Sequence, residues 1–261
     1  MRLAVVGVGK MGGAVLTGAL KAGVLTTSDV GVYHPDAARL EQLAAAHDVT
    51  ALSDDELHRA ERVLLAVKPQ SFDEVAPLVA HRNASYISIM AGVTAETVAR
   101  RVGSSRVVRA MPNLGASVGL SATALAHLPQ ATEEDVSVCE ELFGAVGTVH
   151  HIPERLFDAF TGLAGSGPAF AAVFAEALAD GGVRVGFDRD TSYELVRQVL
   201  LASARLLEVR LPAELKDEVS SAGGTGIAGV RALEHYGLRY SVIQAVEDAT
   251  VRAAELSKQE T

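Results

Sequence analysis

One short stretch, SSAGGTGIAG at residues 220–229, contains residues that could bind an anion. It combines four glycines with three hydroxyl side chains. A helical apolar pattern begins at Ile227, which places Gly223, Gly224 and Thr225 at the expected N-terminus of a helix. Free backbone N–H groups and the helix dipole favour a carboxylate or a phosphate at such a terminus. A simple turn between two helices and a flexible linker are the alternative interpretations of the same residues.

A second glycine-rich stretch, VVGVGKMGGA, is typical of dinucleotide binding. It gives Gly7, Gly9 and Gly12 the spacing G-x-G-x-x-G, directly after an expected strand and at the start of an expected helix. The first glycine permits a tight turn, the second lets a pyrophosphate approach the backbone, and the third lets the helix pack on the strand. A tight turn without a ligand is the alternative, but the position at the start of a βαβ pattern favours a dinucleotide cofactor.

The end of the second expected strand bears on the choice between NADH and NADPH. NAD sites usually place a carboxylate there, which accepts a hydrogen bond from the ribose 2′-hydroxyl. Here the strand ends in Tyr33 and His34, and the first acidic residue is Asp36. A 2′-phosphate is therefore not repelled, and His34 and Arg39 could attract it. NADPH is the favoured cofactor and NADH the alternative, while solvated surface residues would show the same pattern.

Three further motifs could line the same site. LLAVKPQ at 64–70 and RAMPN at 109–113 both end expected strands, and ligands bind beyond the carboxyl ends of parallel strands. AGSGPAF at 164–170 begins a helix, with Pro168 in the first turn and the Ser166 hydroxyl nearby. For the first two motifs the alternative is a strand that a proline terminates, and for the third it is a simple helix cap.

Other kinds of chemistry have no support in the sequence. The eight histidines are scattered without a catalytic-triad or metal-ligand pattern, and the single cysteine, Cys139, cannot form an intramolecular disulfide. A formal net charge of −9 argues against nucleic acid or anionic lipid as a partner. Two charge-poor stretches, 110–132 and 159–175, are interrupted by Gly and Pro, so neither is expected to cross a membrane. Because the first residues lack a signal-peptide pattern, we expect a cytoplasmic protein.

The elements that must position these motifs form two groups. Up to about residue 152, short β-branched runs alternate with helical periods, which predicts an α/β Rossmann-type doubly wound sheet. The expected strands are 3–8, 30–33, 49–52, 63–67, 86–90, 106–111, 121–126 and 148–152. The expected helices between them are 12–22, 36–47, 54–60, 72–80, 94–103 and 133–143.

Helical periods dominate the rest of the chain. The expected helices are 157–163, 168–182, 189–209, 227–236 and 240–256. We therefore expect a dinucleotide-binding domain at residues 1–153 and an all-α domain at residues 154–261. In FAAVFAEAL at 170–178 the apolar residues cover more than a narrow stripe, so this helix must be buried on several sides. A homodimer would bury it, and ordinary core packing is the alternative.

Six segments taken together resemble the pyrroline-5-carboxylate reductase family, in order and over nearly the whole chain. They are GVGKMGGA, LAVKPQ, SIMAGVT, VRAMPN, GLAGSGPAF with EALADGGVRVGF, and LKDEVSSAGGTGIAGVRALE. The last two are the specific ones, because many dehydrogenases share the glycine fingerprint. The resemblance implies a Rossmann domain joined to a helical dimerisation domain, with dimers that often assemble into decamers. It also implies reduction of a cyclic imine carboxylate, pyrroline-5-carboxylate, to L-proline with NAD(P)H.

The resemblance further implies roles for individual residues. In the family, the turn that matches residues 221–226 holds the substrate carboxylate on backbone N–H groups and a hydroxyl, opposite the nicotinamide. We therefore expect Thr225 and Ser221 to be catalytic. The expected substrate-binding residues are Ser220, Gly223, Gly224 and Gly226. The expected cofactor-binding residues are Gly7, Gly9, Lys10, Met11, Gly12, His34, Ser53, Ala66, Lys68, Pro69, Met111 and Asn113.

This sequence departs from the family pattern at the turn. The family commonly has Thr-Ser-Pro-Gly-Gly, a small residue and a second Thr, where this chain has Ser220, Ala222 and Gly226 in place of the first Thr, the Pro and the last Thr. In the family the last Thr offers its hydroxyl to the ring nitrogen of the substrate, which Gly226 cannot do. Thr225 or a water molecule could replace it. The other departures are Leu211 for a His, Ser53 for an Asn, and Leu114-Gly115 for Thr-Pro.

Two hypotheses follow from the sequence. The chain is an active reductase of pyrroline-5-carboxylate or of a related cyclic imine acid, or it is a weakly active dinucleotide-binding paralogue with a regulatory or interaction role. Gly226 is the residue that separates them. A dehydrogenase of hydroxy acids, or an enzyme that transfers hydride between two cofactors, fits only the N-terminal half.

Overall fold

The computed structural model describes residues 2–81 and 83–259. Contacts within the chain divide it into two compact units, one made of residues up to Gly165 together with those from Ala249 onward, and the other of Ser166–Asp248. This division lies later than the expected boundary after residue 153, which stays a prediction. The end of the last helix also joins the first unit, because Ser257 Oγ donates a hydrogen bond to Asp158 Oδ1 at 2.8 Å.

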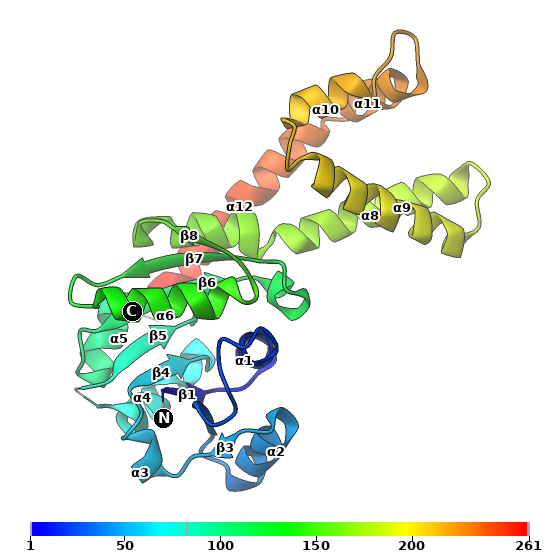
Figure 1. Ribbon diagram of the computed structural model, residues 1–261. Coiled ribbons are helices and arrows are strands. Elements are labelled where there is room, and N and C mark those ends of the chain that lie inside the picture. The colour runs from blue at the N-terminus through cyan, green and yellow to red at the C-terminus, as the bar shows by residue number, and fades with distance from the viewer. Residues whose placement is uncertain (1, 82, 260–261) are drawn as a thin grey trace. The chain divides into compact units, whose positions relative to one another are not determined.

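The first unit contains an eight-stranded sheet with the strand order β3-β2-β1-β4-β5-β6-β7-β8 (Figure 1). Its strands are β1 (Leu3–Val6), β2 (Val30–Tyr33), β3 (Thr50–Ala51), β4 (Arg62–Leu65), β5 (Ser85–Ser88), β6 (Val107–Pro112), β7 (Ser121–His127) and β8 (Gly147–His151). β1 to β6 are paired in parallel, and the strand order reverses between β1 and β4. This is the expected Rossmann arrangement, with a switch point beside β1.

The last two strands run in the opposite direction. β6 and β7 pair antiparallel, whereas β7 and β8 pair parallel. Only residues 113–120 connect β6 to β7, and a parallel crossover needs about a dozen residues or more. The sheet is therefore mixed, and the strand direction follows from the length of the connection.

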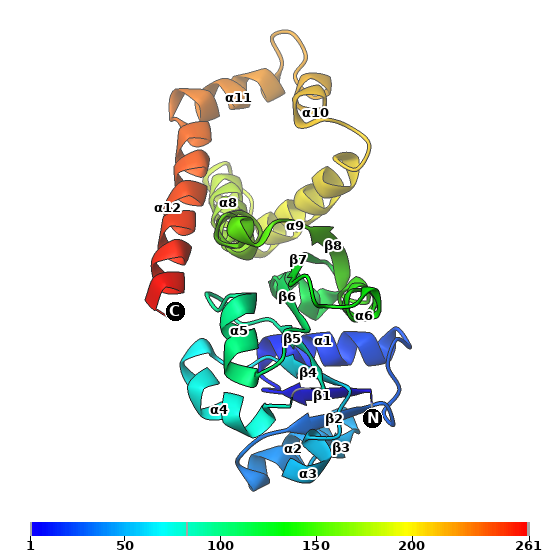
Figure 2. The ribbon, with the colours of Figure 1, turned by 90° about the vertical axis from the view of Figure 1, so that its left-hand side faces the viewer.

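Helices cover both faces of the sheet because successive residues of each strand point to opposite sides. Leu3 and Val5 of β1 belong to a buried cluster with α1 (Lys10–Lys21), α2 (Ala37–His47) and α6 (Glu133–Gly144). Ala4 and Val6 belong to a second cluster on the other face. The helices of that face are α3 (Asp54–Leu57), α4 (Phe72–Val79) and α5 (Ala95–Val102), and α4 and α5 lie on the opposite side of the strands from α6 in Figure 2. The continuous apolar strands of the sequence are thus buried on both sides.

The first unit also contains short helical segments, and long helices form the rest of the chain. The short segments are the 3₁₀ turns η1 (Pro69–Ser71), η2 (Leu114–Val118) and η3 (Glu154–Leu156), the helix α7 (Phe157–Phe160) and the π-helical turn η4 (Thr161–Gly165). The long helices are α8 (Gly167–Arg184), α9 (Arg189–Leu206), α10 (Pro212–Glu218), α11 (Thr225–His235) and α12 (Leu238–Gln259).

The helix α10 is absent from the sequence-based expectation. Its signals are a proline in the first turn, Pro212, and Glu214, whose carboxylate accepts a hydrogen bond from the Leu211 N–H at 2.9 Å. A proline in the first turn and a glutamate that accepts from the N-cap N–H are both typical of a helix start. The helix is short, with seven residues, so its apolar period is too brief to detect.

Apolar side chains of the second unit are widely exposed in the single chain. Val199 on α9 and Ile243 on α12 are 53% and 66% exposed, respectively. By length and composition alone, the helical stretch Glu154–Arg184 could cross a membrane, with a mean hydropathy of 1.3 and 11% of its most apolar window buried. This is weak evidence for a membrane span, because a helix that packs against another protein chain has the same composition.

An ion pair at the amino-terminal end of β6 connects α6 to the sheet. Asp135 is 1% exposed, and Arg106 donates to its two oxygens from Nε at 2.9 Å and Nη2 at 2.7 Å. Asp135 Oδ2 also accepts from the Thr132 N–H at 3.0 Å at the start of α6. Burial by itself raises the pKa of the Asp135 carboxyl, but the hydrogen bonds from Arg106 and Thr132 outweigh it, so the net shift is downward.

We expect Asp135→Asn to lower the free energy of unfolding by about 3 kcal/mol at pH 7, because it leaves Arg106 without its carboxylate. Since the folded pKa lies below the unfolded value of about 3.9, the contribution of Asp135 is fully present above that pH and is lost as the pH falls below it. Urea unfolding between pH 3 and pH 7 measures both effects. A difference between wild type and variant that stays the same at pH 3 and pH 7 would contradict this assignment.

Candidate cofactor and substrate sites

The glycine fingerprint lies in a crowded turn between β1 and α1. Gly7 has φ +92°, and a Cβ there would lie 2.6 Å from the backbone nitrogen of Val67. A Cβ at Gly12 would lie 2.6 Å from the Gly7 carbonyl oxygen and 2.9 Å from the Ala66 Cβ. Only glycine allows these approaches, so Gly7 and Gly12 have the roles in turn and packing that their spacing predicts.

Gly9 differs from these two glycines because its surroundings are open. No atom of the described residues lies within 4 Å of the position that its Cβ would take. Gly9 is the residue before α1, no side chain caps this helix, and its first turn contains no acidic residue. The N–H groups of the first turn, including those of Lys10 and Met11, are therefore available to an anion. These features fit the pyrophosphate of a dinucleotide.

The end of β2 contains His34 and the start of α2. Asp36 caps α2 by accepting a hydrogen bond from the Arg39 N–H at 2.8 Å. The Asp36 N–H donates to His34 Nδ1 at 3.0 Å, which leaves the ring proton on Nε2 as a donor. The nearest carboxylate is thus used by the helix, while His34 and the exposed Arg39 offer donors.

Ser53 has a structural role that the sequence analysis did not identify. Its hydroxyl donates to Glu56 Oε2 at 2.7 Å, and the Glu56 N–H donates to Ser53 Oγ at 3.4 Å. This capping box starts α3 and explains a serine at this position without a ligand. Its contact with the cofactor stays a prediction.

The residues after β4 continue along the same edge of the sheet. The Ala66 N–H donates to the Val6 carbonyl at 2.8 Å and so extends the ladder between β4 and β1. Lys68 is exposed at the start of η1, and Pro69 is partly buried as the first residue of that turn. Ala66, Lys68 and Pro69 therefore lie at the switch point, where a dinucleotide binds in this fold.

Met111 lies near the end of β6, and Asn113 is the first residue after this strand. Both are partly buried. The Asn113 side chain is occupied within the protein, because its Oδ1 accepts from the Gly115 N–H at 3.0 Å and its Nδ2 donates to the Ala164 carbonyl at 2.9 Å. The residue predicted to bind the cofactor thus has its main polar contacts with the chain itself.

Arg109 is a residue that the sequence analysis quoted but did not select. It is 4% exposed, its Nη1 donates to Glu154 Oε1 at 2.8 Å, and its guanidinium lies 4.5 Å from the centre of the Phe157 ring. The sequence does contain a signal for this role, namely an arginine inside an otherwise apolar strand, because a buried charge needs a partner. Tyr33 was also missed: its hydroxyl donates to Asp54 Oδ1 at 2.8 Å, and burial, followed by this bond, raises its pKa to about 12.

The predicted substrate residues lie in the second unit, in the turn between α10 and α11. Gly224 is the residue before α11, which begins at Thr225, slightly before the expected start of the helical pattern at Ile227. No side chain caps α11, and its first turn contains no acidic residue. Gly223 has φ +68°, a conformation that glycine adopts without strain. The first N–H groups of α11 are therefore available to a carboxylate.

Hydroxyl groups surround this helix start. Among the described residues, Ser221 Oγ and Thr225 Oγ1 have no hydrogen-bond partner, and both residues are exposed. Ser220 Oγ is buried and also lacks a partner. Gly226 lies against the end of α10, where an added Cβ would overlap the Val219 carbonyl oxygen. A threonine at position 226 is thus excluded by this backbone, and Ser221 and Thr225 are the accessible hydroxyls.

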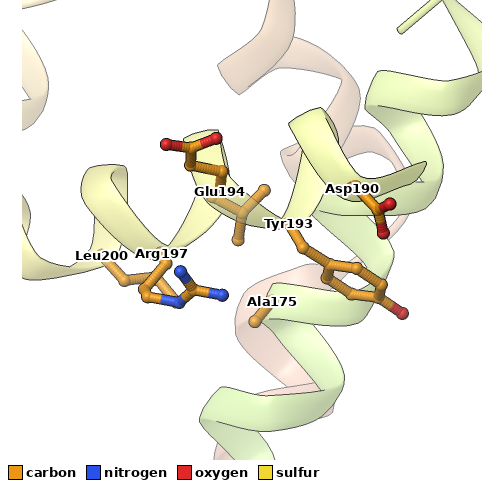
Figure 3. Close-up of a pocket in the computed structure, with 7 residues that line it drawn as sticks. Ala175, Asp190, Tyr193, Glu194, Arg197 and Leu200 are labelled. Carbon is orange, nitrogen blue, oxygen red and sulfur yellow. The ribbon is translucent and has the colours of Figure 1, made fainter. Parts of the chain in front are cut away.

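A separate hollow of about 560 Å³ lies between α8 and α9 (Figure 3). Ala175 of α8 faces Tyr193 and Arg197 of α9 across it. None of the residues predicted to bind cofactor or substrate lines this hollow.

Among the described residues, no group of three or more His, Cys, Asp or Glu side chains could hold a metal ion. Burial raises the pKa of the Cys139 thiol, so this side chain is not a nucleophile at neutral pH.

Comparisons with protein families match both parts of the chain. Residues 154–256 match the family model for pyrroline-5-carboxylate reductase dimerisation. Residues 2–92 match the model for NADP oxidoreductase, coenzyme F420-dependent. This second match is confined to the N-terminal part of the chain.

Individual relatives match over the full length. The chain is 49% identical over 261 residues to the pyrroline-5-carboxylate reductase of Thermus thermophilus, with 100% of both chains covered. It is 40% identical over 268 residues to that of Methanosarcina acetivorans, with 98% of each covered.

Solved structures of pyrroline carboxylate reductases have the same fold as this chain. The pyrroline carboxylate reductase of Plasmodium falciparum, solved with NADP bound, has a TM-score of 0.87 at 26% identity, with 98% of each chain covered. The pyrroline-5-carboxylate reductase of Coxiella burnetii has a TM-score of 0.89 at 29% identity, again with 98% of each chain covered. Full-length identity and the two glycine-rich helix starts agree, and the chain belongs to the pyrroline-5-carboxylate reductase family of nicotinamide-dependent oxidoreductases.

Proposed function

We propose that this protein reduces 1-pyrroline-5-carboxylate to L-proline with NADPH. The observation that carries the proposal is the uncapped start of α11, where Gly223, Gly224 and two free hydroxyls form an anion-binding turn in a chain that belongs to the family. In a protein with a net charge of −9, an anionic substrate needs such a local site.

The cofactor would be held along the carboxyl ends of the strands. The first turn of α1 binds the pyrophosphate at Gly9, and His34 with Arg39 binds the 2′-phosphate of NADPH. Lys68 and Met111 contact the remainder of the dinucleotide. When bound, the reduced nicotinamide supplies the hydride for the imine carbon.

The turn before α11 would hold the substrate. The N–H groups of Thr225 and its neighbours bind the carboxylate, and the Thr225 hydroxyl faces the ring nitrogen. Residues 220–226 contain no ionisable side chain, so the turn orients the imine and water supplies the proton that the ring nitrogen gains. Thr225 takes this role because Gly226 has no hydroxyl.

The second unit would form a homodimer. A hollow of about 910 Å³ lies among α10, α11 and α12, and its lining is mostly apolar, including Val230, Leu233 and Val242. Together with the exposed apolar residues of α8 and α9, this surface suits a second copy of the chain. Association of the dimers into a decamer and a cytoplasmic location are part of the same proposal.

The proposal is tested by following NADPH oxidation by the purified protein with pyrroline-5-carboxylate and, separately, with a six-membered cyclic imine acid. Faster turnover of the five-membered ring supports the proposed substrate. Faster turnover of the six-membered ring would assign the protein to a related imine acid. Tight NADPH binding without turnover of either imine would favour the regulatory paralogue.

We expect Thr225→Val to reduce kcat/KM for the imine by about 10- to 100-fold, because it removes a hydrogen bond to a charged or developing charged group. The dissociation constant of NADPH should stay within about twofold, because α11 is not part of the cofactor site. Thr27→Val, in an exposed loop after α1, is the matched control and should have wild-type kinetics. Equal kinetics for the two variants would remove Thr225 from the proposed mechanism.

We expect Arg39→Ala to raise KM for NADPH by about tenfold and to leave KM for NADH nearly unchanged, because only NADPH has the 2′-phosphate. Arg59→Ala removes the same charge from an exposed position outside the site and controls for net charge. Steady-state kinetics with both cofactors measure the effect. A parallel increase for NADH and NADPH would show that Arg39 does not read the 2′-phosphate.

A further inference from the structure

Asn113 makes a set of hydrogen bonds that determines the orientation of its amide. Two backbone N–H groups, those of Gly115 and Ala122, donate to one end of the amide at 3.0 Å and 3.3 Å. That end must be the oxygen, because only an oxygen accepts. The other end, Nδ2, lies 2.9 Å from the Ala164 carbonyl oxygen and donates to it. Few hydrogen-bonding positions of the side chain are left for a cofactor.

The partner of this amide belongs to an unusual segment. Ala164 lies in the π-helical turn η4, two residues before Ser166, which precedes α8. π-helical turns are rare and occur frequently at functional sites. No side chain caps α8 and its first turn contains no acidic residue, so the Asn113 amide holds a backbone that leads directly into an uncapped helix start.

The same strand holds the beginning of this connection. Arg109 lies on β6, and Asn113 is the first residue after that strand, where it precedes η2. Arg109 binds Glu154, whose Oε1 also accepts from the Ala95 N–H at 2.8 Å. The connection from Glu154 to Gly165 is therefore held near both of its ends, at Glu154 by Arg109 of β6 and at Ala164 by Asn113, the residue that follows β6.

We propose that Asn113 is a positioning residue and not a ligand of the cofactor: it positions the start of α8, whose AGSGPAF motif is a candidate part of the imine-reducing site. Through the Ala164 carbonyl it fixes the π-helical turn and hence the Gly165-Ser166-Gly167 start of α8. The part of this proposal that concerns catalysis rests on the proposed reductase activity. The part that concerns η4 does not require any activity.

Two substitutions separate this role from cofactor binding. Asn113→Asp keeps the oxygen that accepts from Gly115 and Ala122, but it places a second oxygen against the Ala164 carbonyl. Asn113→Ala removes all three bonds. Ser117→Ala, in the same η2 turn, removes an exposed hydroxyl that donates to the Leu114 carbonyl at 2.9 Å and is the control.

The first measurement is hydrogen exchange of peptides that cover residues 158–170, compared with peptides of α1. We expect both Asn113 variants to exchange at least tenfold faster in the 158–170 region, with α1 and the Ser117→Ala control unchanged. Two variants of different chemistry guard against a folding defect in either one, and thermal melting verifies that each is folded. Unchanged exchange in both folded variants would overturn the proposal.

The second measurement is the dissociation constant of NADPH by fluorescence titration, together with kcat and KM for the imine. For both Asn113 variants we expect a dissociation constant of NADPH within twofold of the wild-type value. We expect kcat/KM for the imine to fall by about tenfold, which is the size of one lost hydrogen bond. A tenfold weaker binding of NADPH would make Asn113 a cofactor ligand and overturn the proposal. A wild-type protein without turnover would contradict the proposed function alone, because exchange and NADPH binding still test the positioning role.

Discussion

The close approach of the β1–α1 turn to the end of β4 is the constraint on which the cofactor site depends. Gly7 and Gly12 have no room for a side chain because the backbone of Ala66 and Val67 lies against them. This contact sets the start of α1 beside the switch point of the sheet, where Gly9 is open. The same glycine motif therefore serves packing and the proposed anion site. Gly7 and Gly12 allow the helix to pack against the sheet, and Gly9 leaves space for a phosphate.

The same physical solution recurs at α11. The chain is acidic overall, so its field does not attract an anionic cofactor or substrate. In the proposed function, the uncapped starts of α1 and α11 would provide this attraction locally, through backbone N–H groups that carry partial positive charge. Side-chain hydroxyls at the α11 turn add donors without adding charge, which suits a substrate that must be oriented rather than attacked by a nucleophile.

Strand β6 organises the first unit from both ends. Before the strand, Arg106 binds the buried Asp135 and attaches α6. Arg109 within the strand and Asn113 directly after it attach the connection that leads to α8. These polar groups are largely buried. A buried ion pair or amide is satisfied in only one arrangement, so each of them fixes the orientation of the segment that it binds.

The sequence by itself determined the strands, most helices, the glycine fingerprint and the start of α11, because each of these depends on local periodicity or on glycines at fixed spacing. The resemblance to the family implied cofactor contacts for Ser53 and Asn113. The capping box of Ser53 with Glu56 is a local pattern that the sequence already contains. Only the tertiary structure showed that the Asn113 amide binds Ala164, 51 residues away. It likewise decided the direction of β7, the partner of Arg109 and the contact that excludes a side chain at Gly226. These features depend on which distant backbone atoms meet, and neither periodicity nor residue type in a single sequence contains that information.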